Sequence, residues 1–507
     1  RDHCVTGVQT CALPISRNPL RDQWTAFLNT KYGYIPFVDF AKGLGHVIGK
    51  TDMLAEWRAA GGDQAFFTSL DHAAKAVQAK EIMGFDGNKL MKYAKNPLEA
   101  LRLFSEFMEK GTRVGAYAKA RSKGATPQQA AHEAREITID FSRAGTVGRE
   151  LNRIIAFWNA NIQDIDKVSR TWKDRPGVTT AKILLGITLP SLALAWAQKD
   201  DDEYRSLPDW QRNLFWNIRV PGGKEFITLP KPFAPGILFG SVPERMVDYA
   251  VTGDRKAVKS SVLDALASIN PFDLPTAIKP VVQMITGYDF FRGRAIEGQG
   301  DKKLVAAYRG GAGTSATLRK ATEKGYEWTG GVVNVGPAML MQAVRGYTGG
   351  LGKMALDGAD IATRAADKPD VADPSLRWNE YPLVRGLVKG EPIGPKSGDI
   401  DRFYDYKEEA AQAMATYKTI ATKGKDAQKA AGFLEQHRIQ AALSKEMEKA
   451  ARHLSKLRQA SLAVMQEKGL SGDAKRERLD DLDRRATNIA KSANRTYLER
   501  TKKAASR

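Results

Sequence analysis

Apolar side chains recur every three or four residues over much of the chain, which is the period of an amphipathic helix. They hold this spacing over residues 97–119, and Gly124 follows as a stop signal. Thr126 and Gln129 then flank a Pro-Gln pair, the pattern of a capping box at the start of a new helix. A third stripe covers residues 147–172. These patterns predict a bundle of amphipathic helices.

The most apolar segment of the chain is 183–197 (ILLGITLPSLALAWA). A helix of these 15 residues measures about 22 Å, shorter than the ~30 Å hydrocarbon core of a bilayer, and Pro190 is expected to kink it. Two hypotheses stay open: a helix buried in the protein core, or a helix that enters a membrane interface under some condition. The candidate membrane contacts are Leu184, Leu185, Leu189, Leu192 and Trp196.

Residues 217–229 predict a short β-hairpin, because two β-prone runs flank the turn residues Pro221, Gly222 and Gly223. One hairpin in a helical chain suggests an appended flap. Glycines then interrupt residues 301–398, which predicts loosely packed connecting structure with short helices at 337–344 and 353–365.

The last region, 399–507, predicts an antiparallel helical hairpin or coiled coil. A heptad-like apolar stripe runs from Leu443 to Val464, a loop follows at Gly469, and a second stripe covers 479–493. The expected fold class is therefore mainly α: a multi-helix bundle with one short β-hairpin, a Gly-rich irregular region and this C-terminal hairpin.

Residues 5–15 (VTGVQTCALPI) resemble the translation of a common sequencing-library adapter. Polar residues interrupt the apolar run that a signal peptide would need. We therefore expect residues 1–16 to be an artefact, and residues 17–95 to be the N-terminal helical remnant of a larger protein. Cys4 and Cys11 belong to the artefact, so the rest of the chain needs no oxidising compartment.

The chain is strongly basic. Lys and Arg number 78 against 58 Asp and Glu, a net charge of +20 that favours nucleic acid or an anionic membrane as partner. Residues 401–507 hold 24 Lys and Arg against 15 Asp and Glu, hence 9 of the 20 excess charges. A solvated helix surface and a nucleic-acid contact both account for such a tail.

No motif predicts catalysis, a cofactor or a metal. The glycines of 43–49 have the wrong final spacing for a dinucleotide loop, and 310–314 lack the Gly-Lys-Ser/Thr ending of a phosphate loop. His132-Glu133 has no second histidine one helical turn further on. We expect no catalytic, cofactor-binding or metal-binding residues.

Two groups of residues carry a family resemblance. The first group is Arg135, Asp140, Phe141, Arg143, Phe157, Trp158, Asn159, Ala160 and Gln163. The second is Pro208, Trp210, Trp216, Pro221, Gly222, Gly223, Pro232, Phe233, Pro243, Glu244 and Arg245. With their neighbours they resemble the large polyvalent protein associated domain 38 family, over residues 96–300.

The resemblance implies a multi-module protein of tailed phages or conjugative elements that is packaged in the virion and delivered with the DNA. The leading hypothesis is a non-catalytic internal virion or ejection-type protein, which reaches the host envelope or cytoplasm after delivery. It would contact DNA, the envelope and other virion proteins, or itself through its C-terminal helices. Two alternatives stay open: a DNA-binding accessory protein of a mobile element, and the C-terminal structural region of a larger enzyme whose catalytic module lies upstream.

Overall fold

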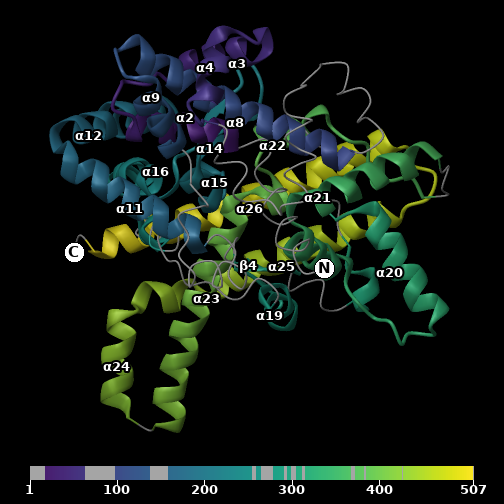
Figure 1. The fold of residues 1–507 in the computed structure, drawn as a ribbon. Helices are drawn as coiled ribbons and strands as arrows, with labels where there is room; N and C mark the ends of the chain where they lie inside the picture. Colours follow the sequence, from purple (N-terminus) through teal and green to yellow (C-terminus); the bar gives the residue numbers. More distant parts are fainter. Residues whose placement is uncertain are drawn as a thin grey trace.

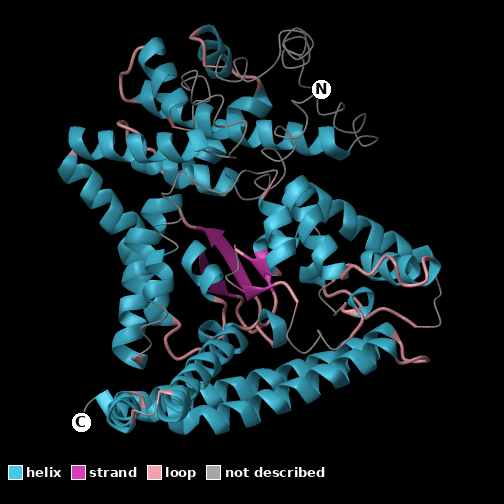
Figure 2. Ribbon diagram, turned by 90° about the horizontal axis from the view of Figure 1, so that it is seen from below, coloured by secondary structure: helices cyan, strands magenta, loops and turns pink. Residues whose placement is uncertain are grey.

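Helices form most of the protein and surround a small sheet in a computed structural model (Figures 1 and 2). The structure describes residues 18–62, 97–137, 158–253, 258–263, 266, 278–290, 294–297, 304–310, 314–366, 371–381, 384–424 and 426–505. The adapter-like residues 1–16 lie outside these ranges. The predicted fold class, mainly α with a short hairpin, is confirmed.

The elements follow one another as helices with short strands between them. The first helices are α2 (Asn18–Asn29), α3 (Val38–Gly49), α4 (Asp52–Ala59), α8 (Pro97–Ser122), α9 (Pro127–Glu136) and α11 (Trp158–Asp174). Next come α12 (Pro176–Ile183), a π-helical turn (Leu184–Thr188), α13 (Leu189–Ala197), α14 (Asp202–Arg205), α15 (Asp209–Leu214), α16 (Phe233–Gly236), a second π-helical turn (Ile237–Ser241) and α17 (Val242–Thr252). The remainder are α19 (Lys279–Thr286), α20 (Ala316–Trp328), α21 (Pro337–Ala366), α22 (Val384–Leu387), α23 (Gly398–Lys418), a third π-helical turn (Thr419–Lys423), α24 (Ala427–Gln436), α25 (Arg438–Gln466) and α26 (Gly472–Ala505). The strands are β1 (Phe215–Arg219), β2 (Phe226–Pro230), β3 (Tyr288–Asp289), β4 (Arg294–Ala295) and β5 (Val388–Lys389), and single 3₁₀ turns cover Ala306–Tyr308, Trp378–Glu380 and Gly394–Lys396.

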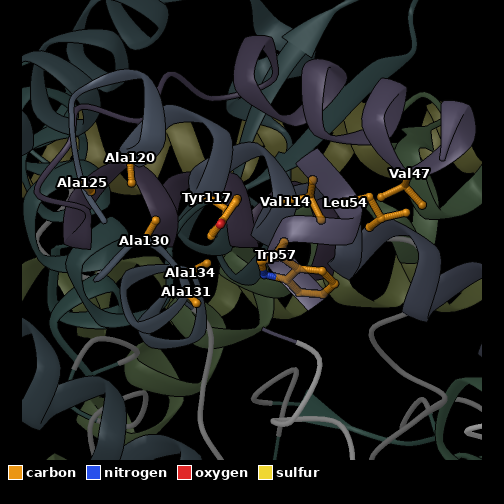
Figure 3. Packing of buried hydrophobic residues seen from close by; sticks show 10 residues of the cluster. All are labelled: Val47, Leu54, Trp57, Val114, Tyr117, Ala120, Ala125, Ala130, Ala131 and Ala134. Carbon is orange, nitrogen blue, oxygen red and sulfur yellow. The ribbon is translucent and has the colours of Figure 1, made fainter. Parts of the chain in front are cut away.

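Helices α3 and α8 pack backbone against backbone, because glycines occupy their contact. A Cβ atom on Gly43 would lie 2.0 Å from the carbonyl oxygen of Gly111, and one on Gly115 would lie 2.1 Å from that of Asp39. The glycine run that superficially matches a dinucleotide loop is thus part of a packed helix. Beside this contact lies a core of Trp57, Tyr117 and aliphatic residues, five of which are alanines (Figure 3).

The predicted helix boundaries in this region are confirmed. Helix α8 ends at Ser122, and Gly124 follows with a φ of 86°, which glycine adopts without strain. The Thr126 hydroxyl accepts a hydrogen bond from the Gln129 amide at 3.3 Å. The Gln129 side chain accepts one from the Thr126 amide at 3.0 Å, which completes the capping box.

The predicted hairpin is present as β1 and β2, but the expectation of an appended flap is wrong. Strand β5, more than 150 residues further along the chain, pairs with β2 and makes an antiparallel sheet of three strands. This sheet lies among the helices (Figure 2), and Phe226 and Thr228 are fully buried. Arg219 at the end of β1 pairs with Asp201 at 2.5 Å, so the hairpin is also tied to the start of α14.

The Gly-rich region is more regular than predicted. The two short helices expected at 337–344 and 353–365 are one continuous helix, α21. Its Gly346 lies against Pro280 of α19, where an added Cβ would approach the proline ring to 2.5 Å. Glycine thus permits a close helix contact here instead of breaking the chain.

The predicted C-terminal hairpin is confirmed as α25 and α26, joined by a loop in which Gly469 has a φ of 78°. Leu443, Met447 and Leu454 of the predicted stripe are buried. Helix α23 adds a third member that the pattern did not predict. Its Tyr406 stacks on Tyr497 of α26 with ring centroids 4.5 Å apart.

We expect Gly43→Ala and Gly115→Ala each to lower the free energy of unfolding by roughly 1–3 kcal/mol, because the new methyl group meets backbone atoms that cannot move aside. Gly45 of the same helix has no atom within 4 Å of an added Cβ. Gly45→Ala is therefore the matched control, and we expect it to be neutral or to stabilise by about 0.5–1 kcal/mol. Urea denaturation measures all three. Equal effects of the substitutions at Gly43 and Gly45 would contradict the close contact.

Candidate functional site

The apolar segment predicted at 183–197 belongs to a longer helix. Helix α12, the π-helical turn and α13 run without a break over Pro176–Ala197, 22 residues that would measure about 33 Å. A π-helical turn lies just before Pro190. There the Leu189 amide bonds to the carbonyl of Leu184, five residues back, where a regular α-helix would use the carbonyl four residues back.

One face of this helix packs on the protein. Its buried residues recur every four positions: Thr179, Ile183, Ile187, Ser191 and Ala195. The indole nitrogen of Trp216 on β1 donates to the Ser191 hydroxyl at 2.7 Å. The helix is therefore bound to the edge of the central sheet.

The other face is also apolar, and it is exposed. Leu184 is 48%, Leu185 66%, Leu189 52% and Trp196 61% exposed, whereas Leu192 is half-buried. The hypothesis that this helix is buried in the core is thus wrong for this face. By length and composition the helix could cross a membrane, and only 28% of its most apolar stretch is buried. We call Leu184, Leu185, Leu189, Leu192 and Trp196 the apolar stripe.

Polar contacts fix the N-terminal half of the helix to α2. The Lys182 ammonium donates to the carbonyl oxygens of Phe27 at 2.7 Å and Thr30 at 2.9 Å. These carbonyls lie at the end of α2 and just beyond it, where backbone acceptors lack intrahelical partners. At the other end, the Lys199 ammonium lies over the Trp196 ring, 3.9 Å from its centroid.

A second feature is a charge network buried beside the sheet. The Lys231 ammonium is 3.0 Å from both carboxylate oxygens of Glu244, and the two side chains are only 1% and 3% exposed. Lys231 also donates to the Ser241 hydroxyl at 2.8 Å and the Arg212 carbonyl at 3.1 Å. The Ser241 hydroxyl in turn donates to the Asn213 carbonyl at 2.6 Å. All three ammonium hydrogens thus have acceptors.

Two arginines complete the network. Arg245 donates to the Asn213 side chain at 3.0 Å and pairs with Asp209 at 3.2 Å. Arg212 pairs with Asp248 at 2.7 Å, and its guanidinium lies 4.4 Å from the ring centroid of Tyr204. With Lys231 and Glu244, the network holds three cations and three carboxylates, so its charges balance.

Burial governs the ionisation of the network. It lowers the pKa of the Lys231 ammonium, and Glu244 acts in the opposite direction. Burial also lowers the pKa of Arg245, and the neighbouring Arg212 cation lowers it further. The contacts of the network join α15, the end of β2 and α17, and Arg402 of α23 reaches the same Asp209 at 3.6 Å.

The structure places the predicted family residues in different surroundings. In the second group, Glu244 and Arg245 belong to the network, the Trp216 indole donates to the Ser191 hydroxyl, and Pro208 and Pro232 are buried. Pro221, Gly222 and Gly223 form the hairpin turn. Pro243 lies in the first turn of α17, Phe233 is the first residue of α16, and the Trp210 ring lies edge-on to Phe215.

The first group is only partly described. Arg135 is half-buried in the last turn of α9, whereas Asp140, Phe141, Arg143 and Phe157 lie outside the described residues. Trp158, Asn159, Ala160 and Gln163 form the first turns of α11.

Sequence reasoning missed two of the six charged residues of the network. Arg212 and Asp248 stand in no motif, and their pairing depends on the way α15 meets α17. In the acidic run 200–203, Asp201 caps α14 by accepting from the amides of Glu203 and Tyr204. Among the described residues, no group of three or more His, Cys, Asp and Glu side chains could hold a metal ion.

We expect Lys231→Met to lower the free energy of unfolding by about 3–5 kcal/mol, because it leaves the Glu244 carboxylate buried without its cation. The double variant Lys231→Met/Glu244→Leu should lose much less than the sum of its single changes. Arg495→Met is the matched control, since its ion pair with Glu499 is exposed, and we expect no measurable loss of stability. Additive losses in urea denaturation would contradict the coupling of the pair.

The comparisons with known proteins agree with the family resemblance. Residues 201–384 match the family described as large polyvalent protein associated domain 38. The match begins later than the expected 96–300 and continues through α21, and neither the curated proteins nor the solved structures gave a match. The apolar helix lies just before the matched residues, and the network lies wholly within them. The part of the chain that holds the sheet hairpin and the buried network is thus similar to the large polyvalent protein associated domain 38 family, which points to the polyvalent proteins of phages and mobile elements.

Proposed function

We propose that this chain is a non-catalytic, helical part of a phage or mobile-element polyvalent protein that is delivered with the genome and binds the host membrane. The observation that supports the proposal is the apolar stripe on the helix Pro176–Ala197. A helix that packs on its own protein ordinarily has a polar outer face. Here, instead, Leu185, Leu189 and Trp196 are all more than half exposed.

Physical chemistry favours a lipid surface as the partner of this stripe. Full burial of one leucine side chain is worth about 1.5–3 kcal/mol. Trp196, at one end of the stripe, is the residue type that concentrates at membrane interfaces, and Lys199 beside it can reach the headgroups. The net charge of +20 adds attraction to anionic membranes.

The basic C-terminal region supports nucleic acid as a second partner, but ion pairs within the protein neutralise part of its positive charge. Several of its arginines are paired with acids: Arg476 with Glu380, Arg484 with Glu391 and Arg500 with Glu446. These pairs reduce the charge left for phosphates. Nucleic-acid binding is therefore an outcome of the test below.

The test is flotation of the full chain with liposomes at about 0.05 M and about 0.5 M salt, which screens surface charges but not apolar contacts. We expect flotation to persist at high salt, and we expect Leu185→Asp/Leu189→Asp to abolish it there. The matched control is Ile48→Asp/Ile285→Asp, two helical positions that are 67% and 80% exposed on α3 and α19. It should float like the unchanged protein.

Three results would contradict the membrane proposal. The first is a protein that does not float at either salt concentration. The second is a control variant that loses flotation as fully as Leu185→Asp/Leu189→Asp. Flotation that high salt abolishes in every variant would leave only surface charge as the cause. In that event, steeply salt-dependent binding to duplex DNA would favour the nucleic-acid partner.

A further inference from the structure

A basic pocket lies where α2 and α8 end. Lys31, Tyr32, Gly33, Lys119 and Lys123 line this cavity of about 390 Å³. No site or motif discussed above includes it. We call it the lysine pocket.

Contacts with the helices hold the loop that forms one wall of the pocket. The Lys31 amide donates to a Glu133 carboxylate oxygen at 2.6 Å, and the Tyr32 side chain packs on the core shared by α4, α8 and α9. Gly33 has a φ of 76°, and an added Cβ there would have no atom within 4 Å, so this side of the pocket is open. The pocket is therefore a shallow depression that is open to solvent and has one wall held in place by these contacts.

The lysine pocket carries an excess of positive charge. Among the described residues, neither Lys31 nor Lys123 makes an ion pair. Lys119 lies 3.8 Å from Asp39, which is also 3.9 Å from Lys42 and accepts a hydrogen bond from the Ile35 amide. One carboxylate thus serves two lysines, and Glu133 is the other acid at this loop. An anionic ligand would find cations that the protein itself does not neutralise.

The pocket adjoins the apolar helix. Lys182 of that helix donates to the carbonyl of Thr30, the residue before Lys31, and Arg175 donates to the carbonyl of Asn29 at 3.5 Å. Helix α2 contacts both α8 and α12, and all three lie in the upper part of Figure 1. The uncompensated cations therefore lie beside the N-terminal half of the helix that bears the apolar stripe.

We propose that the lysine pocket binds the phosphate of an anionic phospholipid headgroup while the apolar stripe lies at the acyl boundary. The inference rests on the proposed membrane function and adds the class of lipid. Interfacial helices combine an apolar contact with cations that meet anionic headgroups. The lysine ammonium, a compact charge with three donors, binds phosphate well.

The test measures binding of the full chain to vesicles of phosphatidylcholine, with and without about one-third phosphatidylglycerol. The variant Lys31→Gln/Lys119→Gln/Lys123→Gln removes the pocket charges. Near a membrane surface each lysine is worth about fivefold in affinity. We therefore expect this variant to bind phosphatidylglycerol vesicles roughly 100-fold more weakly and to keep its binding to pure phosphatidylcholine.

The matched control is Lys445→Gln/Lys449→Gln/Lys456→Gln, which removes the same charge from exposed positions of α25. Its loss of affinity for phosphatidylglycerol vesicles should stay within about threefold. Thermal unfolding by circular dichroism shows whether each variant is folded. Equal losses in the pocket and control variants would overturn the inference, because charge alone would then explain the lipid preference.

Further experiments distinguish a lipid phosphate from a soluble phosphate or DNA, and they test the lysine pocket and the membrane function separately. Glycerol phosphate at millimolar concentration should displace less than a tenth of the protein from phosphatidylglycerol vesicles, since it lacks the acyl chains; full displacement would assign the pocket to a soluble phosphate. Duplex DNA that binds the unchanged protein but not the pocket variant, with vesicle binding unaltered, would assign it to nucleic acid. Leu185→Asp/Leu189→Asp should lose binding to both vesicle types. If this variant still binds both types while the pocket variant behaves as expected, the result counts against the proposed membrane function and not against the lysine pocket.

Discussion

The ion pair between Lys231 and Glu244 is the constraint on which the middle of the molecule depends. A buried ammonium and a buried carboxylate are tolerated only where their partners are fixed in place. Those partners come from α15, the end of β2 and the turn before α17, so the pair sets the positions of all three at once. Strand β1 follows α15 directly, and its Trp216 then holds the apolar helix through Ser191.

The same network reaches the C-terminal helices. Asp209 is shared by Arg245 and by Arg402 of α23, at 3.2 Å and 3.6 Å. The Gly398 amide donates to the Ser206 carbonyl at 2.7 Å, and a Cβ on Gly398 would lie 2.6 Å from the Leu207 carbonyl oxygen. A side chain at residue 398 would thus separate α23 from the region that matches the polyvalent family.

What the sequence predicts correctly depends on local interactions. The capping box at Thr126, the hairpin turn and the heptad stripe of α25 each depend on a few neighbouring residues, and each is confirmed. What it misses depends on distant contacts: Gly346 lies against Pro280, and Arg212 meets Asp248, as a result of packing that leaves no periodic signal. The outer face of the apolar helix could not be predicted because hydrophobicity on both faces suits a buried helix as well as a membrane contact.

The packing of that helix bears on how it would meet a membrane. A helix that crosses a bilayer must give up its polar contacts with the protein or carry them into hydrocarbon. Here that would break the hydrogen bonds of Lys182 to the end of α2 and of Trp216 to Ser191. A helix that lies in the interface keeps both, because they belong to the inner face and the apolar stripe to the outer one. For the membrane contact proposed above, the geometry therefore favours a helix that lies in the plane of the membrane, with the lysine pocket beside the helix and not beyond its end.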